Sequence, residues 1–285
     1  MKPARRSTSS PSRDRRPSRQ DRIIGIGEIG GTLAARWSRN GHSVRVSNSR
    51  GPEAARPFAD KIGAVAADIY GAVEGADIAL LSMPFPAVAT LPKDLFERSA
   101  QDVVIVDTAN YFPDERDPRI GDIDAAMPES VWVSRQLRRP IVKAFNSIMF
   151  YALSELGKRE GAPDRPALPV AGDDVRGKRV VMDLVNETGF DPVDDGTLEE
   201  SWRQQPSTPA YCCDLWRGKD ARRPPRRGQR PGRDDPLRNP GHARVPEPLP
   251  VPRLPAAKRH RPLPDLPPLL GGDSDGRGYD LAHHR

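Results

Sequence analysis

Residues 22–36 read Arg-Ile-Ile-Gly-Ile-Gly-Glu-Ile-Gly-Gly-Thr-Leu-Ala-Ala-Arg and are the most informative segment of the chain. It contains the pattern Gly-x-Gly-x-x-Gly between an apolar pair and a helix-like run. In a strand–turn–helix unit, Gly25 permits the tight turn, Gly27 lets the backbone approach a pyrophosphate, and Gly30 lets the helix pack close to the strand. The N–H groups at the start of that helix are then free to bind phosphate. The glycines alone are weak evidence, so the surrounding sequence has to support them.

The second predicted strand supplies part of that support. Residues 42–48 alternate in polarity and lead into Asn48, Ser49 and Arg50. An NAD-preferring site places Asp or Glu roughly 20 residues after the glycines to bind the ribose 2′-hydroxyl, and no carboxylate stands here. A hydroxyl and a guanidinium suit a 2′-phosphate instead. The sequence therefore favours NADP over NAD, against the alternative that Ser-Arg-Gly-Pro is a surface turn with an incidental arginine.

Strands and helices alternate along the middle of the chain. The expected strands are 23–24, 42–48, 64–67, 77–83, 103–107, 141–145, 167–171 and 190–193. The expected helices are 32–40, 52–62, 69–74 and 174–188, with a broken helix over 87–91 and 95–99. This alternation predicts an α/β fold with a Rossmann-type, doubly wound parallel sheet. Residues 20–22 (Gln-Asp-Arg) are poor material for a central strand buried on both faces, so we expect the first strand to be damaged.

The two ends of the chain differ in composition from the middle. Residues 1–22 carry a net charge of +6 and residues 217–285 one of +8; since the whole chain totals +6, residues 23–216 carry −8. A nucleic-acid-binding protein is expected to present a basic face on its folded part, so we expect no nucleic-acid partner. Residues 217–285 also hold 14 prolines without a sustained period. We expect disordered tails over 1–22 and 216–285 around one domain over 23–215.

Three interpretations of the C-terminal tail stay open. It is a solvated disordered segment, a polyproline ligand for another domain, or the translation of a GC-rich gene in a shifted frame. The poor first strand raises the same question for residues 1–22. No stretch approaches the roughly 18 apolar residues of a membrane helix, and the adjacent Cys212 and Cys213 match neither a structural disulfide nor a metal-binding spacing. We therefore expect a cytoplasmic protein with no membrane partner and no metal.

An ordered series of motifs carries a family resemblance across residues 23–213. The motifs are Gly-Ile-Gly-Glu-Ile-Gly-Gly-Thr-Leu-Ala (25–34), Ser-Asn-Ser-Arg-Gly-Pro-Glu (47–53), Val-Asp-Thr-Ala-Asn-Tyr (106–111), Ile-Val-Lys-Ala-Phe-Asn-Ser (141–147), Ala-Leu-Pro-Val-Ala-Gly-Asp-Asp (167–174), Gly-Phe-Asp-Pro-Val-Asp (189–194) and Gln-Pro-Ser-Thr-Pro-Ala-Tyr (205–211). The series resembles the NADP oxidoreductases that depend on the deazaflavin coenzyme F420. Their N-terminal domain is shared with pyrroline-5-carboxylate reductases. The resemblance implies a Rossmann domain with a small C-terminal extension.

The resemblance also implies a reaction and its site. The reaction is hydride transfer between NADP(H) and a deazaflavin, and a homodimer is plausible. The implied cofactor contacts are Gly25, Ile26, Gly27, Glu28, Ile29 and Gly30 at the pyrophosphate, Asn48, Ser49 and Arg50 at the 2′-phosphate, Met83, Pro84, Ala109 and Asn110 at the nicotinamide, and Asn146 toward the deazaflavin. No catalytic residue is assigned, because in direct hydride transfer the cofactors carry the chemistry and the protein aligns them.

Three residues outside this set have alternative interpretations. Asp107 at a strand end is either a catalytic carboxylate or the cap of the following turn, and we favour the cap. Lys143 within a strand is either a snorkelling lysine or an ion-pair partner, and we favour both of these over a Schiff-base lysine. Tyr211 either stacks on a cofactor ring or is a core or lid tyrosine.

Departures from the family pattern keep other functions open. Glu28 places a carboxylate beside the expected pyrophosphate and would repel it unless the side chain turns to solvent. Asn146 stands where relatives with a deazaflavin site carry His. The alternatives are a non-catalytic NADP-binding redox sensor, a reductase of small imines, and an inactive product with frameshifted ends.

Overall fold

The computed structural model describes residues 19–100 and 102–212. This part of the chain forms one sheet of eight strands. The strands are β1 (Gln20–Ile24), β2 (Ser43–Ser47), β3 (Val65–Ala66), β4 (Ile78–Leu81), β5 (Val104–Asp107), β6 (Val142–Lys143), β7 (Ala167–Gly172) and β8 (Asp191–Asp194). The helices are α1 (Glu28–Arg39), α2 (Pro52–Ile62), η1 (Phe85–Thr90), η2 (Leu95–Arg98), α3 (Gly121–Asp124), α4 (Glu129–Leu137), α5 (Phe150–Glu155), α6 (Val175–Thr188) and η3 (Leu198–Gln204), where η marks a 3₁₀ helix.

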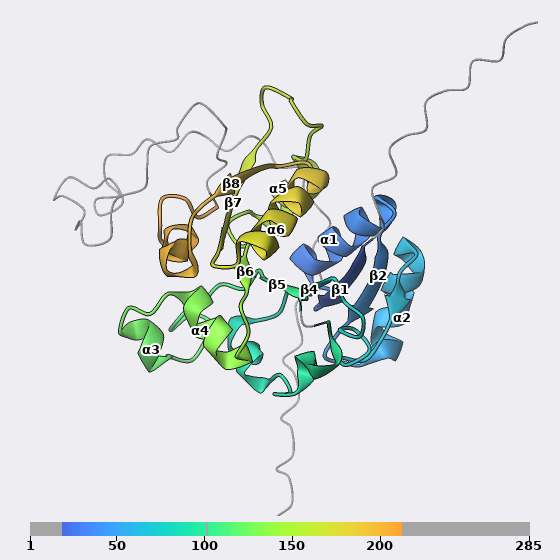
Figure 1. The fold of residues 1–285 in the computed structure, drawn as a ribbon, viewed down its shortest axis with the longest axis horizontal. Helices are drawn as coiled ribbons and strands as arrows, with labels where there is room; N and C mark the ends of the chain where they lie inside the picture. Colours follow the sequence, from blue (N-terminus) through green and yellow to red (C-terminus); the bar gives the residue numbers. More distant parts are fainter. Residues whose placement is uncertain (1–18, 101, 213–285) are drawn as a thin grey trace, which may run out of the picture. The chain divides into compact units, whose positions relative to one another are not determined.

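The strand order is β3-β2-β1-β4-β5-β6-β7-β8 (Figure 1). Its first six strands have the order of a doubly wound dinucleotide-binding sheet, in which the strand order reverses between the parallel strands β1 and β4. All neighbouring strands run parallel except β6 and β7, which pair antiparallel. The predicted Rossmann-type fold is therefore confirmed, and the sheet is mostly parallel, with β7 and β8 running opposite to the first six strands.

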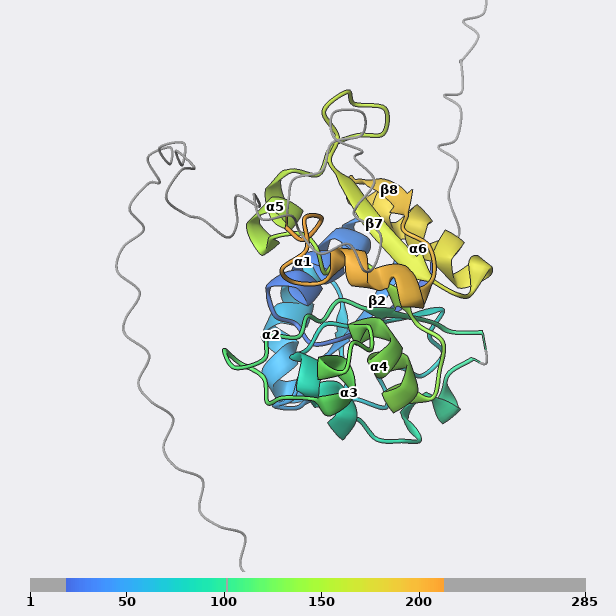
Figure 2. The same ribbon diagram turned by 90° about the vertical axis from the view of Figure 1, so that its left-hand side faces the viewer.

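Apolar side chains of the central strands are divided between two clusters. In β4, Ile78 and Leu80 belong to a cluster with Trp37 of α1, whereas Leu81 belongs to a cluster with Trp132 of α4. Successive residues of a strand point to opposite faces, so each cluster covers one face of the sheet. Helices α1, α2, α5 and α6 contribute to the first cluster, and η1, η2, α4 and η3 to the second. Figure 2 shows η3, drawn in orange, crossing beside α4.

Two helices have the bounds that their end signals predict. Helix α2 spans Pro52–Ile62 and ends at Gly63, which has a left-handed backbone with φ 72°. Helix α6 follows Asp174, whose carboxylate accepts hydrogen bonds from the backbone N–H groups of Arg176 and Gly177. A cap of this kind satisfies N–H groups that have no partner within the helix.

The first strand is longer than its sequence suggests. It begins at Gln20, and the side chains of Asp21 and Arg22 are buried within it. Arg22 donates hydrogen bonds to the carbonyl oxygens of Glu74 and Ser43, so its charge is solvated by the ends of neighbouring elements. The expectation of a damaged first strand and of a tail reaching residue 22 is therefore wrong. The remainder of the predicted tails, residues 1–18 and 216–285, lies outside the described residues.

Other differences are local. The helix expected over residues 69–74 is a series of turns, and the broken helix over 87–99 is the 3₁₀ pair η1 and η2. Helices α3, α4, α5 and η3 were not predicted, because each is short and lacks a sustained helical period. After β6, the last strand of the doubly wound part, the chain continues through α5, β7, α6, β8 and η3, where the C-terminal extension was expected.

Candidate functional site

A cavity of about 800 Å³ lies where β1, β2 and β4 end at the point of reversed strand order. Ligands of open α/β sheets bind at this position, and the volume is within the range of small-molecule sites. The predicted contacts that line it are Gly25, Ile26, Gly27, Asn48, Ser49, Arg50, Met83 and Pro84. The structure thus brings together eight residues from three separate turns of the chain.

The glycine turn has the three properties that phosphate binding requires. Gly25 has φ +99°, and a Cβ atom on it would lie 1.9 Å from the Ser82 carbonyl oxygen. A Cβ on Gly30 would lie 2.1 Å from the Gly25 carbonyl oxygen, so α1 starts in close contact with the turn. A Cβ on Gly27 would meet nothing within 4 Å, so the space above this backbone is open. No side chain caps the N-terminus of α1, whose first-turn N–H groups are available to an anion.

The turn after β2 presents a positive charge to the same cavity. The Asn48 side-chain oxygen accepts a hydrogen bond from the Arg50 backbone N–H at 2.7 Å, which fixes the turn. Gly51 completes it with φ 88°. The Arg50 side chain is exposed, and no carboxylate within residues 19–212 forms an ion pair with it. By contrast, Arg56 on α2 pairs with Glu53 at 2.7 Å.

Three predicted contacts lie beside the cavity rather than on its wall. The Glu28 side chain is exposed and lines a separate groove of about 420 Å³, together with Arg36 and Arg39. Its carboxylate therefore avoids the repulsion that the sequence suggests. Ile29 packs against the first apolar cluster, and Gly30 is buried.

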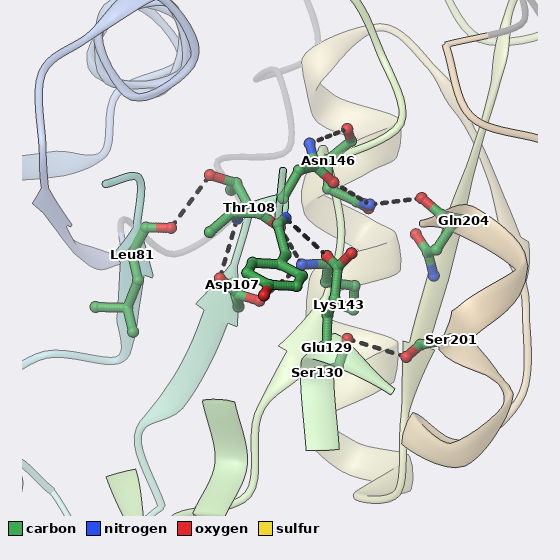
Figure 3. Close-up of polar contacts among 12 residues, drawn as sticks. Leu81, Asp107, Thr108, Glu129, Ser130, Lys143, Asn146, Ser201 and Gln204 are labelled. Carbon is green, nitrogen blue, oxygen red and sulfur yellow. Dashed lines mark hydrogen bonds and ion pairs between the residues drawn. The ribbon is translucent and has the colours of Figure 1, made fainter. Parts of the chain in front are cut away.

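The other predicted contacts, Ala109, Asn110 and Asn146, form a second group after β5 and β6, of which Figure 3 labels Asn146. The Asn110 side-chain amide donates a hydrogen bond to the Asn146 carbonyl oxygen at 2.9 Å, and the Asn146 amide donates to Asn110 Oδ1 at 3.1 Å. Asn146 also donates to the Gln204 carbonyl oxygen at 2.8 Å. The backbone at Phe145 has φ 60°, a left-handed conformation that is costly for a bulky residue. This unusual turn directs Asn146 toward Asn110.

Charged side chains are buried beneath this group. Asp107 Oδ1 accepts the Ala109 N–H at 3.0 Å, and Asp107 Oδ2 lies 2.8 Å from Lys143 Nζ. Asp107 thus caps its turn and Lys143 is an ion-pair partner, as the sequence favours. Burial raises the pKa of Glu129 to about 7, although the nearby Lys143 acts in the opposite direction. Burial also raises the pKa of the Tyr211 phenol, whose oxygen lies 3.4 Å from the Asn110 amide nitrogen.

The two groups meet at the ends of neighbouring strands. The Thr108 hydroxyl donates a hydrogen bond to the Leu81 carbonyl oxygen at 3.1 Å. The turn after β5 is thereby attached to the end of β4, and Ser82, Met83 and Pro84, which follow β4, line the cavity.

Within residues 19–100 and 102–212, no helix has the length and apolar character needed to cross a membrane.

The comparison with known families agrees with the glycine turn. Residues 22–111 match the family described as "NADP oxidoreductase coenzyme F420-dependent". The match spans less than half of the chain. The matched segment contains α1, the Arg50 turn, the cavity and the turn after β5, and it ends before α4.

Two individual relatives match this chain over different lengths. The protein YjhV of Escherichia coli (strain K12) is 60% identical over 55 residues, which are 19% of this chain and 40% of that protein. The match therefore spans less than half the length of this curated relative. The hypothetical protein SMa0349 of Sinorhizobium meliloti is 27% identical with a TM-score of 0.59, covering 72% of this chain and 97% of its own.

A third structure shows the shared fold. It comes from Arthrobacter sp. FB24 and is described as a "putative f420 dependent nadp-reductase". It is 18% identical with a TM-score of 0.52, covering 65% of this chain and 88% of its own. Likeness at this identity concerns the fold alone.

The cavity also has lining residues that the sequence does not single out, among them Asp68, Ile69, Thr90 and Leu91. Ile69 lies in a segment that was expected to be helical and forms turns instead, and Thr90 is the last residue of the 3₁₀ helix η1. Glu129 has no local signal at all, because only the packing of α4 buries it.

Proposed function

We propose that the cavity binds NADP(H) and that the protein transfers a hydride between NADPH and a deazaflavin-type acceptor. The observation that carries the proposal is the joint exposure, in one cavity, of the open backbone at Gly27 and the Arg50 guanidinium. Backbone N–H groups at a helix N-terminus bind a pyrophosphate, and an arginine binds a further phosphate through charge-assisted hydrogen bonds. The donor set therefore fits a dinucleotide with an additional 2′-phosphate.

The two ends of the cofactor have separate positions under this proposal. Asn48, Ser49 and Arg50 hold the 2′-phosphate, and Ile26–Ile29 surround the pyrophosphate. Met83 and Pro84 after β4, with Ala109 and Asn110 after β5, border the nicotinamide. The nicotinamide and the acceptor supply the hydride chemistry, while these residues align the two rings and exclude water. Asn146 lies beside Asn110 and is placed to contact the acceptor.

Cofactor selectivity tests the first part of the proposal. We expect Arg50→Gln to weaken NADPH binding by about tenfold to a hundredfold, the range of a hydrogen bond to a charged group. NADH binding is expected to change by less than about threefold, since NADH has no 2′-phosphate for the guanidinium to bind. The control is Arg39→Gln, which removes an arginine from the neighbouring groove. Calorimetry measures both affinities, and an equal loss for NADH and NADPH would contradict the 2′-phosphate role.

Turnover tests the second part. Oxidation of NADPH is followed by absorbance with coenzyme F420 as the acceptor, and in parallel with a small cyclic imine. Turnover with the deazaflavin supports the proposed reaction, and turnover with the imine alone would replace it with imine reduction. Tight NADPH binding without either reaction would instead indicate a redox sensor.

A further inference from the structure

Three charged side chains are buried together beneath the turn after β5 (Figure 3). Asp107 and Lys143 have no exposed surface, and Glu129 is 2% exposed. They come from β5, β6 and the first turn of α4, so only the tertiary structure brings them together. None of the three lines the cavity.

Their hydrogen bonds go to the backbone of one short segment. Lys143 Nζ contacts Asp107 Oδ2 at 2.8 Å and donates to the Ala109 carbonyl oxygen. The Ala109 N–H donates to Asp107 Oδ1, so both backbone groups of Ala109 are held by the ion pair. The Tyr111 N–H donates to Glu129 Oε2 at 3.2 Å. Residues 109–111 are thus fixed from below at both ends.

The opposite side of the segment is fixed as well. Asn110 lies between the two anchored residues. Its side-chain amide donates to the Asn146 backbone carbonyl oxygen, and its Oδ1 accepts from the Asn146 side-chain amide. The Asp107–Lys143 ion pair therefore fixes the position of the Ala109 backbone, and the contact with Asn146 fixes the orientation of the Asn110 side chain. A segment held on both sides by buried groups has one conformation, which is what precise alignment of a reacting ring requires.

Stability alone does not account for this arrangement. Removing charges from water is costly, and well-packed apolar residues of similar volume often stabilise a protein as much as a buried ion pair does. The three groups also carry two negative charges against one positive charge when Glu129 is ionised. An incompletely balanced buried cluster under the turn that borders the proposed nicotinamide position points to a role in the site.

We propose that Asp107, Lys143 and Glu129 form a positioning unit that holds residues 109–111 against the nicotinamide end of the bound cofactor. The inference rests on the proposed function. None of the three is a catalytic residue, because each acts through the backbone of residues 109–111. The unit is expected to affect the nicotinamide half of the cofactor and to leave the adenine half, held at Arg50, unchanged.

We expect the unit to respond to pH near neutrality, because Glu129 is one of its three members. Three charged groups act on Glu129, namely Lys143 of β6, Asp107 of β5 and Arg116 of the loop between β5 and α3. The Tyr211 phenol also lies within electrostatic range of Glu129. The pKa of Glu129 is about 7, raised mainly by burial. An ionised carboxylate accepts the Tyr111 N–H more strongly than a protonated one does. The nicotinamide environment is therefore expected to change around this pH.

Binding measurements separate the two halves of the cofactor without requiring an acceptor. The probe of the adenine half is 2′,5′-ADP, and the probe of the whole cofactor is NADPH, whose nicotinamide fluorescence reports its surroundings. We expect the affinity of Lys143→Met and Glu129→Gln for 2′,5′-ADP to stay within about twofold of the wild type. Their affinity for NADPH is expected to fall about tenfold or more, which corresponds to the loss of one hydrogen bond to a charged group. The fluorescence of NADPH bound to the wild type is expected to titrate with a midpoint near pH 7, and this titration is expected to vanish in Glu129→Gln.

The matched control is Lys178→Met, which removes the lysine of another ion pair, the one with Asp194 at 2.7 Å. It is expected to change neither the NADPH affinity nor the fluorescence titration. Circular dichroism checks that each variant is folded, and if Lys143→Met does not fold, the isosteric Glu129→Gln decides. Unchanged NADPH affinity and an unchanged pH titration in folded Glu129→Gln would overturn the positioning unit. Failure of the wild type to bind 2′,5′-ADP would instead overturn the proposed function.

Discussion

The ion pairs of His42 give the sharpest prediction for stability. His42 Nε2 is hydrogen-bonded to Glu187 Oε2 at 3.1 Å, and His42 Nδ1 lies 3.1 Å from Asp21 Oδ2, a contact with the geometry of an ion pair rather than of an aligned hydrogen bond. The imidazole joins the loop before β2 to β1 and to the last turn of α6. Asp21 first, and then Glu187, raise the pKa of His42 from 6.5 to about 9, against the effect of burial.

The pKa shift sets the size and the pH range of the effect. The rise in the pKa of His42 from 6.5 to about 9 corresponds to about 3 kcal/mol of extra stability while His42 is protonated. Because Glu187 is 13% exposed, we expect solvent to reduce this value to about 2–3 kcal/mol. The folded-state pKa is above the unfolded-state pKa, so the stabilisation is complete below about pH 6.5 and is lost as the pH rises through about 9.

The perturbation is His42→Gln, which keeps a polar side chain and removes the titratable charge. Urea unfolding of the full chain is followed by circular dichroism at pH 6 and at pH 10. We expect the variant to be less stable by about 2–3 kcal/mol at pH 6 and by less than about 1 kcal/mol at pH 10. The other four histidines, at positions 242, 260, 283 and 284, are present in both proteins and cancel in the difference.

The control variant is Arg56→Gln, which breaks an exposed ion pair with Glu53. Its two side chains are 59% and 81% exposed, so we expect a change of less than about 0.5 kcal/mol at either pH. An equal loss of stability in His42→Gln at pH 6 and pH 10 would refute the reasoning, because it would show that His42 acts through packing and not through its charge.

Two further predictions concern backbone positions. Gly30→Ala places a Cβ 2.1 Å from the Gly25 carbonyl oxygen, so we expect it to lower the free energy of unfolding in urea by about 1–3 kcal/mol. A Cβ at Gly27 meets open space, so we expect Gly27→Ala to have a free energy of unfolding within about 1 kcal/mol of the wild type and to weaken NADPH binding in calorimetry. The reverse order of stability would contradict the turn geometry. Asp174→Ala removes the cap of α6 and is expected to cost about 1 kcal/mol, so an unchanged urea midpoint would show that the cap contributes nothing.

Local signals explain why parts of the fold could be predicted. Helix α2 begins at Pro52 and ends before Gly63, and both residues act through their own backbone preferences, without reference to the rest of the chain. The cap at Asp174 and the glycine turn are local in the same sense. The first strand was predicted less well, because Asp21 and Arg22 are tolerated there only through partners that are distant in the sequence, such as His42 and Glu74.

The Rossmann-type sheet and the position of the glycine turn follow from the sequence alone, since glycine spacing and apolar periodicity act over a few residues. The sequence also placed an arginine after the second strand. Only the tertiary structure decided that Arg50 and Gly27 face one cavity, that Glu28 turns into another groove, and that Glu129 lies beside Lys143. Burial and charge pairing are properties of surfaces in contact, and those contacts exist only after distant segments have packed together.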